Sequence, residues 1–406
     1  MAKPTGAICN LDCSYCFYLD KASLYPGARF RMRDETMEAY VRQSLESQDA
    51  PEVTIAWQGG EPTLMGLAFF ARMVETAERY RRPGQVIRHT LQTNATLLTD
   101  EWGVFLAEHR FLVGISIDGP PDLHDRFRVD KRGRPTSERV LSGLDVLRHH
   151  QVDYNVLCTV HAGNVGEPLR VYRYLRDDCG ALVIQFIPIV EHQPNPDDPY
   201  AVSERSVPSA AWGDFLIAIF DEWVGRDLGE VYVQTFDAIL APHLGLPAGL
   251  CVFAETCGHA VALEHNGDVY SCDHFVDPAH RLGNLHETHL VELVGSDRQQ
   301  RFGNEKRDSL PRYCIECEVR DACWGECPKN RFVLTPDGEE GLNYLCAGYK
   351  AFFTRVDVPL RSMAELIRSG RPAADLRTAI ARAGRNDTCP CGSGLKTKRC
   401  HQRHPA

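Results

Sequence analysis

Three cysteines near the start of the chain constrain its fold most strongly. Cys9, Cys13 and Cys16 follow the spacing C-x3-C-x2-C, and the aromatic pair Phe17-Tyr18 comes directly after them. Three thiolates on one tight loop can hold three corners of a cubane iron–sulfur cluster, which leaves the fourth iron without a protein ligand. A zinc knuckle is the alternative, but no His or Cys follows soon enough to complete four ligands. Disulfides are disfavoured because three cysteines within eight residues pair poorly. The spacing therefore favours a cluster with one open iron.

The composition limits the number of domains and the class of protein that this chain can form. The chain has 406 residues, 43% of them hydrophobic, which is enough for two or more domains with cores. Its formal net charge of -10 disfavours wholesale nucleic-acid binding. No apolar run reaches the roughly 18 residues that a membrane helix needs, so we expect no membrane partner. Sixteen cysteines without a recognisable signal peptide indicate a metalloprotein of a reducing compartment, which we take to be the cytoplasm.

The first half of the chain alternates between strand-like and helix-like segments. Amphipathic spacing predicts helices over 34–47, 67–82 and 136–150, with Asp34 and Ser137 as possible N-caps. Apolar, β-branched runs predict five strands, over 53–57, 86–91, 112–117, 154–160 and 182–189. This alternation predicts a parallel sheet, flat or curled into a barrel. A short strand before Cys9 would make six, and the eight residues available for it are consistent with a start codon assigned too late.

Polar residues follow three of the predicted strands where each one ends. The three runs are Gln58-Gly59-Gly60-Glu61, Gln92-Thr93-Asn94 and Ser116-Ile117-Asp118. In parallel barrels the carboxyl ends of the strands carry the functional site. Paired glycines let the backbone come close to a ligand, and Glu61 adds a carboxylate, although a string of this kind by itself is more often a turn.

Residues 251–346 contain a second cysteine framework. Its eight cysteines divide into two sets of four, enough for two fully ligated 4Fe–4S clusters, although a pair of zinc sites would suit the C-x2-C spacing equally well. Their positions are 251, 257, 272, 314, 317, 323, 327 and 346. The segment 264–270 (EHNGDVY) indicates a hairpin with a turn at Asn266-Gly267. A proline-rich loop over 191–208 and an apolar helix over 209–224 lead into this half.

The tail forms a third module after a linker over 370–384, which is expected to be partly helical. Cys389, Cys391, Cys400 and His401 offer three thiols and one imidazole, a complete tetrahedral zinc set. A metal-free disulfide is the weaker alternative. The basic side chains of the tail suggest a docking surface for a protein or an anionic partner, or equally a solvated face. They are Lys396, Lys398, Arg399 and Arg403.

Together these motifs resemble those of known families. The spacing C-x3-C-x2-C with its aromatic residue resembles the signature of radical S-adenosylmethionine (SAM) enzymes, the pattern C-x9-G-x4-C … C-x2-C-x5-C-x3-C … C resembles the SPASM domain, and the tail resembles the SEC-C motif. The strings KPTGAICNLDCSYCFYLDK, WQGGEP, SIDGP and CDHFV resemble anaerobic sulfatase-maturating enzymes, with similarity from Lys3 to Ile367. The resemblance implies an α/β fold with a partial (β/α)6 TIM-like radical SAM barrel over 1–230. A cysteine-rich α+β SPASM domain over 231–369, the linker over 370–384 and a small zinc-binding tail over 385–406 would follow.

The same resemblance implies an activity. Members of this family oxidise an active-site Cys or Ser of a sulfatase to Cα-formylglycine, with SAM and three 4Fe–4S clusters as cofactors. The implied partners are an unfolded or nascent sulfatase polypeptide and an electron donor such as flavodoxin or ferredoxin. One alternative is another SPASM maturase, which cross-links a ribosomal peptide by a thioether or epimerises it. A second is a non-enzymatic iron–sulfur electron-transfer protein, which would give no role to the GGEP string or to an open iron.

Site residues follow from the resemblance position by position. Asp273 would accept a proton, with Tyr18 and Gln58 near the substrate side chain; a hydrogen-bonding or salt-bridging role is the alternative for Asp273. Arg139 would contact SAM, although an arginine on a helix is as often just solvated. The residues expected to bind SAM are Gly59, Gly60, Glu61, Gln92, Asn94, Ser116, Asp118 and Arg139. Auxiliary cluster I would be held by Cys251, Cys257, Cys272 and Cys327, and auxiliary cluster II by Cys314, Cys317, Cys323 and Cys346.

Overall fold

A computed structural model describes residues 1–401 and divides the chain into two compact units. The first unit contains residues 1–117, 121–157 and 257–304, and the second contains residues 118–120, 158–256 and those from 305 onward. Arg403 and the last residues of the predicted zinc tail lie outside the described part. Residues 257–304 of the predicted SPASM segment thus belong to the same compact unit as the cluster loop.

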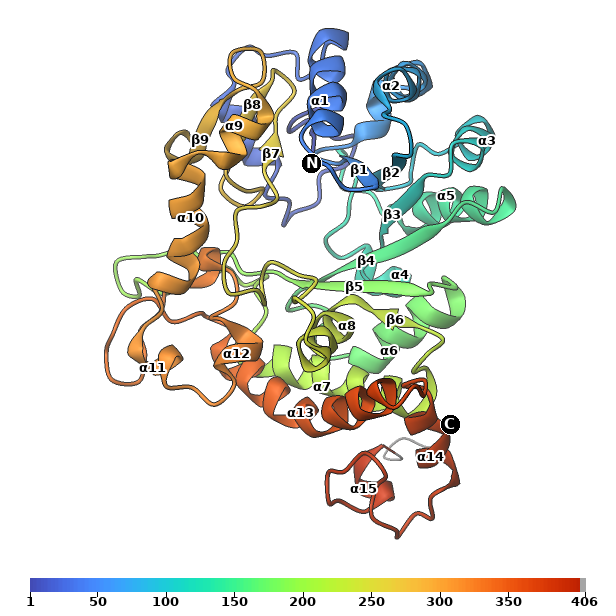
Figure 1. Cartoon of the computed structure of the whole chain (residues 1–406), viewed down its shortest axis with the longest axis vertical. Coiled ribbons are helices and arrows are strands. Elements are labelled where there is room, and N and C mark those ends of the chain that lie inside the picture. The colour runs from blue at the N-terminus through green and yellow to red at the C-terminus, as the bar shows by residue number, and fades with distance from the viewer. Residues whose placement is uncertain (402–406) are drawn as a thin grey trace. The chain divides into compact units, whose positions relative to one another are not determined.

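The predicted fold class is confirmed. Six strands form a parallel sheet in the order β1-β2-β3-β4-β5-β6 (Figure 1). They are β1 (Glu52–Trp57), β2 (Val86–Thr93), β3 (Leu112–Ser116), β4 (Tyr154–Val160), β5 (Val183–Pro188) and β6 (Tyr232–Val233). In β1 the alternate residues Val53, Ile55 and Trp57 are buried, as expected where successive side chains point to opposite faces. The first five strands match the predicted segments to within two residues at each end.

The sixth strand is not the predicted one. The segment before Cys9 contributes isolated parallel bridges, from Ala2 to Trp57 and from Ala2 to Leu263, and is not one of the named strands. The sixth strand is β6, which pairs in parallel with β5 through Val183 and Tyr232. Two residues are too few to show a period of two, so no sequence pattern marks β6 as a strand.

The helices of the first unit confirm the predicted segments but not their caps. They are α1 (Asp34–Glu46), α2 (Leu67–Tyr80), α3 (Asp100–Glu108), α4 (Pro121–His124) and α5 (Ser137–His149), of which α3 and α4 were not predicted. The N-caps of α1 and α5 are Arg33 and Thr136, not Asp34 and Ser137. At α5 the carboxylate of Asp125 accepts hydrogen bonds from the amides of Thr136 and Ser137, at 2.8 and 2.9 Å. The predicted capping function is therefore supplied from outside the helix.

Residues 257–304 form a small antiparallel sheet. Its strands are β7 (Ala262–Leu263), β8 (Asp268–Tyr270) and β9 (Arg281–Asn284), and α9 (Leu290–Gly295) and α10 (Asp297–Asp308) follow. The predicted hairpin is present, with Ala262 opposite Tyr270. Gly267 in its turn has φ +94°, a conformation that glycine adopts without the steric cost of a side chain.

Two long helices organise the second unit. These are α7 (Ser209–Arg226) and α13 (Cys346–Arg368), which pack closely along each other (Figure 1). The shorter helices are α6 (Pro168–Arg173), α8 (Gln234–Leu240), α11 (Arg312–Ile315), α12 (Arg320–Cys323), α14 (Asp375–Arg382) and α15 (Thr397–Cys400). The predicted linker contains α14, whose Leu376 and Ile380 are buried, so this segment is packed. Within residues 1–401, no helix combines the length and the apolar character required to cross a bilayer.

Candidate active site and metal centres

The loop that carries Cys9, Cys13 and Cys16 is held by backbone pairing. The amides of Asp12 and Ser14 donate to the carbonyls of Val129 and Phe127, at 2.8 and 3.0 Å. All three cysteines are partly exposed. The loop is thus fixed along one edge, and all three cysteine residues keep some exposed surface.

The paired glycines after β1 bring the strand end against this loop. The amide of Gly60 donates to the carbonyl of Gly6 at 2.9 Å, and the amide of Glu61 donates to the carbonyl of Ile8 at 2.9 Å. A Cβ added to Gly60 would lie 2.0 Å from the carbonyl oxygen of Ile8, which is a severe overlap. Gly60 thus comes close to the segment leading into Cys9, and its predicted contact with SAM stays a prediction.

Glu61 lies inside the fold. Its carboxylate is fully buried and accepts hydrogen bonds from the amide and hydroxyl of Thr63, the hydroxyl of Thr93 and the amide of Asn94, at 2.6–3.0 Å. Burial raises the pKa of Glu61, although these hydrogen bonds oppose the shift. With both oxygens occupied, the side chain ties the end of β1 to the end of β2. These hydrogen bonds give Glu61 a positioning role, and its direct contact with SAM stays a prediction.

Asn94 faces the cluster loop in a defined orientation. Its Oδ1 accepts from the amide of Thr96 at 3.0 Å, and a backbone amide can only donate. Nδ2 must therefore point the other way, where it donates to Oδ1 of Asn10 at 2.9 Å and lies 3.6 Å from Sγ of Cys9. The amide of Leu11 also donates to Sγ of Cys9, at 3.3 Å. Two N–H groups thus face the first cysteine; sequence reasoning missed Asn10, although it directly follows Cys9.

The remaining predicted SAM-binding residues occupy different environments. Nε2 of Gln92 donates to the hydroxyl of Ser116 at 3.1 Å, so these two strand ends are joined. Asp118 belongs to the second unit, where its buried carboxylate accepts from the amide of Thr159 at 2.9 Å. Arg139 is 43% exposed and lies 3.3 Å from the carboxylate of Asp130. The Arg139 side chain is therefore neither free nor simply solvated.

Asp273 lies among the residues predicted to surround the substrate. The hydroxyl of Tyr18 donates to Oδ2 of Asp273 at 2.6 Å, and Nε2 of Gln58 donates to the same oxygen at 3.2 Å. The ammonium of Lys3, which is fully buried, forms an ion pair with Oδ1. Nζ of Lys21 donates to the Asp273 backbone carbonyl at 2.8 Å. The structure thus brings Asp273, Tyr18 and Gln58 together and adds two lysines that were not singled out from the sequence.

Burial and charge together set the protonation of these residues. Burial favours a raised pKa for Asp273, but the charges of Lys3 and then Lys21 outweigh it and hold that pKa below its usual range. Burial and the neighbouring Asp273 carboxylate raise the pKa of Tyr18 well above its usual value. Burial, followed by the charge of Lys3, lowers the pKa of Lys21 to about 8. At neutral pH the site presents an ionised carboxylate and a neutral phenol that donates to it.

The cysteines predicted for auxiliary cluster II share one pocket in the second unit. Cys314, Cys317, Cys323 and Cys346 all line it, together with the side chains of Tyr313 and Tyr349 among others. Cys314 lies on α11, Cys317 in the connection between α11 and α12, Cys323 at the end of α12 and Cys346 at the first residue of α13. Burial raises the pKa of Cys323 to about 12 and that of Cys346 to about 11, and in each case a neighbouring cysteine of the set adds to the shift.

The cysteines predicted for auxiliary cluster I are divided between the units. Cys257 and Cys272 belong to the first unit, and Cys251 and Cys327 belong to the second. Within the first unit, the amide of Cys257 donates to the carbonyl of Gly303 at 3.2 Å. This set stays a prediction.

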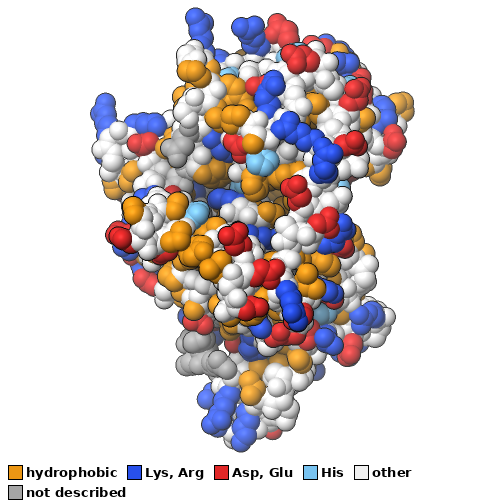
Figure 2. Space-filling model, turned by 90° about the vertical axis from the view of Figure 1, so that its left-hand side faces the viewer, with side chains coloured by type: hydrophobic (Ala, Val, Ile, Leu, Met, Phe, Trp, Pro, Cys, Tyr) orange, Lys and Arg blue, Asp and Glu red, His pale blue; other side chains and the backbone are white. Residues whose placement is uncertain are grey.

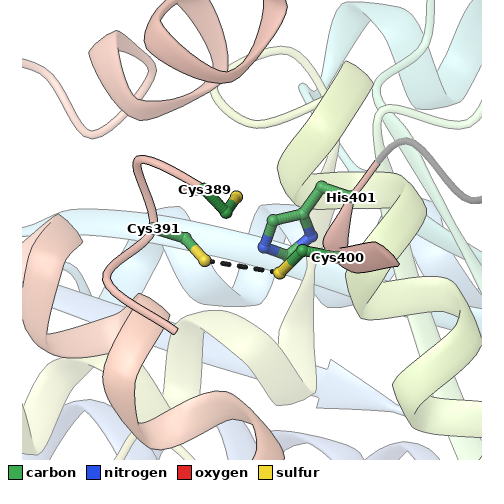
Figure 3. A group of neighbouring side chains, drawn as sticks. All are labelled: Cys389, Cys391, Cys400 and His401. Atoms are coloured by element: carbon green, nitrogen blue, oxygen red, sulfur yellow. Dashed lines mark hydrogen bonds between the residues drawn. The ribbon is translucent and has the colours of Figure 1, made fainter. Parts of the chain in front are cut away.

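The tail residues form a compact metal-ligand set (Figure 3). One ligand atom from each of Cys389, Cys391, Cys400 and His401 lies within 4.8 Å of all the others. Sγ of Cys391 and Sγ of Cys400 are 3.5 Å apart. With Zn–S bonds of about 2.3 Å, a tetrahedral site has sulfur–sulfur edges of about 3.8 Å. The donor set and its spacing fit one zinc ion.

The other cysteines are spaced differently. Across residues 1–401, no three of the remaining cysteines have their sulfur atoms within 4.8 Å of one another. A cubane holds its thiolates on separate irons, farther apart than the ligands of a single zinc ion. The ligand assignments of the Cys9 set and of the Cys314 set stay predictions.

Comparison with known proteins agrees with this geometry. Residues 4–175 match the Radical SAM superfamily, residues 251–318 match an iron-sulfur cluster-binding domain (SPASM), and residues 385–403 match the SEC-C motif. The serine-type anaerobic sulfatase-maturating enzyme of Bacteroides thetaiotaomicron is 43% identical over 393 residues, which cover 94% of this chain and 94% of that protein. The chain belongs to the anaerobic sulfatase-maturating enzymes.

Further relatives of this maturating enzyme include serine-type and cysteine-type enzymes. The cysteine-type enzyme of Clostridium perfringens is 32% identical over 359 residues, covering 87% of this chain and 94% of that protein. The solved structure of native anSMEcpe with bound AdoMet and the Cp18Cys peptide has a TM-score of 0.79 and 31% identity, and covers 90% of this chain and 98% of that one. The maturating enzyme is accordingly a radical SAM enzyme that binds SAM and iron–sulfur, as predicted.

Proposed function

We propose that this maturating enzyme oxidises one serine or cysteine of a sulfatase polypeptide to Cα-formylglycine. The observation that carries the proposal is the ionised carboxylate of Asp273, which the hydroxyl of Tyr18 and the amide of Gln58 hold in place. When bound, SAM and the clusters supply the radical that takes hydrogen from the substrate Cβ and accept the electron left behind. The relatives at 43% and 36% identity are serine-type enzymes, which supports a seryl substrate.

In the proposed reaction, one residue of this chain accepts a proton from the substrate. Oxidation of the side chain releases the proton of the substrate hydroxyl or thiol, and Oδ2 of Asp273 accepts it. A serine then becomes the aldehyde directly, whereas a cysteine becomes a thioaldehyde that water converts to the aldehyde with loss of hydrogen sulfide. Tyr18 and Gln58 orient that oxygen by hydrogen bonds of 2.6 and 3.2 Å. The ion pair with Lys3 occupies the other oxygen, so the carboxylate has one defined accepting side.

We further propose the metal content and the reductant. Eleven cysteines in three sets would hold three 4Fe–4S clusters: Cys9, Cys13 and Cys16; Cys251, Cys257, Cys272 and Cys327; and Cys314, Cys317, Cys323 and Cys346. The shared pocket of the last set supports its assignment to one cluster. Cys389, Cys391, Cys400 and His401 would hold zinc. A flavodoxin or a ferredoxin would supply electrons.

One experiment separates this function from its rivals. The protein with reconstituted clusters is incubated without oxygen with SAM, a reductant and a peptide that carries the sulfatase motif with Ser, Cys or Ala at the target position. We expect a product that loses two hydrogens from the Ser peptide and forms an adduct with a hydrazide, which reports an aldehyde. The Ala peptide is the control and stays unchanged.

Each other outcome counts against the proposal. Loss of two hydrogens without a hydrazide adduct would indicate a cross-linking enzyme. A peptide whose mass is unchanged in ordinary water but which gains one deuterium in deuterium oxide would indicate an epimerase. Absence of any SAM consumption would indicate an electron-transfer protein.

A further inference from the structure

The cysteine tail is docked on the two long helices of the second unit. The hydroxyl of Ser362, on α13, donates to the carbonyl of Cys391 at 3.1 Å. On α7, a Cβ added to Gly225 would lie 3.0 Å from the carbonyl oxygen of His401, so the tail backbone closely approaches this helix. The tail therefore contacts both α7 and α13.

The imidazole of His401 is oriented by α7. Its Nδ1 lies 3.3 Å from the carbonyl oxygen and 3.7 Å from the carboxylate of Asp221. Its Nε2 is buried and makes no hydrogen bond within the described part of the chain. Histidines that bind a metal commonly use one ring nitrogen for the metal and the other for a carboxylate or a backbone carbonyl. Asp221 is placed to hold His401 with Nε2 toward the three thiols.

A residue of α13 joins the same contact. The guanidinium of Arg355 forms an ion pair with the carboxylate of Asp221, and its Nη2 lies 3.5 Å from Sγ of Cys400. The Asp221 side chain is only 8% exposed, so this charge depends on its partners. One buried carboxylate thus connects α7, α13 and the ligand set of the tail.

At the opposite end of the helix pair, Gly348 lets the backbones of α7 and α13 come close together. A Cβ added to Gly348 of α13 would lie 2.0 Å from the carbonyl oxygen of Ser209 at the start of α7. The amide of Gly348 also donates to the hydroxyl of Ser209 at 3.2 Å. Gly348 is two residues after Cys346, a predicted ligand of auxiliary cluster II. The helix that begins at this cluster ligand is therefore held to α7 at its start by backbone contact and farther along by the tail.

We propose that zinc in the tail locks α7 to α13, with Asp221 and Arg355 as positioning residues for His401 and Cys400. The inference rests on the proposal that the tail binds zinc. It assigns the tail a structural role in the second unit, in place of the docking surface suggested by its basic residues. Lys and Arg side chains do gather over the tail at the lower end of Figure 2, but its ligand side faces the two helices.

The first test measures zinc affinity in the full chain. Asp221→Asn keeps the shape of the side chain but removes the charge that faces His401 and Arg355. Changes to groups that orient metal ligands typically cost about 10–100-fold in metal affinity, and we expect a loss in that range in competition with a chromogenic chelator. Asp214→Asn is the matched control, because Asp214 lies on the same helix and is exposed; its zinc affinity should equal that of the wild type. Wild-type affinity in Asp221→Asn would overturn the assignment of Asp221.

The second test asks whether zinc holds the helices. Amide hydrogen exchange is compared between zinc-loaded wild type, chelator-treated wild type and Cys391→Ser, with iron measured on each sample. We expect exchange to quicken in 219–226 of α7 and 355–364 of α13 when zinc is absent, and to stay unchanged in β1 of the first unit. Unchanged exchange in both helices would show that the tail is an independent appendage and would overturn the proposal. Wild-type protein that binds no zinc would instead refute the underlying zinc site and leave the proposed sulfatase maturation untouched.

Discussion

The hydroxyl of Tyr18 donates a hydrogen bond of 2.6 Å to Oδ2 of Asp273, although the two residues are 255 positions apart. Tyr18 is the second residue after Cys16 of the cluster loop, and Asp273 directly follows Cys272. The contact joins the loop of the proposed SAM cluster to a residue beside a proposed auxiliary-cluster ligand.

Asp273→Asn should separate peptide oxidation from SAM cleavage. The amide keeps the shape of the side chain and loses the basic oxygen. General acid–base groups contribute about 10²–10⁴-fold, so formylglycine formation should fall by that range while reductive cleavage of SAM continues. Both rates are measured by chromatography and mass spectrometry on one sample of known iron content. Full peptide oxidation by the variant would contradict the proton-accepting role.

Tyr18→Phe should weaken the same step by a smaller amount. A hydrogen bond to a charged group is worth about 1.5–3 kcal/mol, which corresponds to about 10–100-fold in rate if the bond is fully used in the transition state. Tyr25→Phe is a matched control, because the Tyr25 hydroxyl bonds to a different carboxylate, that of Asp268, at 3.1 Å. A control variant as impaired in peptide oxidation as Tyr18→Phe would indicate general destabilisation of this unit.

Asn94→Leu should make the proposed SAM cluster harder to reduce. The substitution removes the N–H group that lies 3.6 Å from Sγ of Cys9. Hydrogen bonds to cluster sulfurs stabilise the more negative, reduced state, so the midpoint potential should become more negative. Potentiometry followed by electron paramagnetic resonance measures this shift, with SAM added to identify the signal of the cluster. Gln92→Leu, which changes a side chain bonded to Ser116, should leave the potential unchanged.

Gly60→Ala should destabilise the segment that leads into the cluster loop. The new methyl group would lie 2.0 Å from the carbonyl oxygen of Ile8, and overpacking of this kind costs about 1–3 kcal/mol. Gly166→Ala is the control, because nothing lies within 4 Å of the added Cβ there. Thermal unfolding of the two variants compares them directly. Equal unfolding midpoints for the two variants would mean that the Ile8 segment shifts to accommodate the methyl group without loss of stability.

Iron content should report three clusters. Protein reconstituted without oxygen should contain about twelve irons, four for each cubane, and replacement of Cys9, Cys13 and Cys16 by Ala should leave about eight. Quantitative iron analysis, with zinc measured on the same sample, provides the check. A wild-type content of about four irons, with zinc in the remaining sites, would remove both auxiliary clusters from the proposal.

Local spacing was enough to predict most of the sheet and to propose metal ligands. Cys9, Cys13 and Cys16 share one short loop, and the tail set lies within thirteen residues, so each set can be proposed before the chain is folded. The strands β1 to β5 are marked by runs of apolar, β-branched residues, a signal that depends only on neighbours in sequence. These features are local, and the sequence by itself determined them.

Tertiary structure alone decided the contacts between distant residues. The pairing of Lys3 with Asp273, the capping of α5 by Asp125 and the contact of Asp221 with His401 each join groups whose partners no sequence pattern indicates. Glu61 is a further example of a contact that the sequence does not reveal. Its buried carboxylate accepts hydrogen bonds from Thr93 and Asn94, and only the fold brings these two residues to it. The physical reason is that hydrogen bonds and ion pairs act over a few ångströms in space, whereas the sequence records only the distance along the chain.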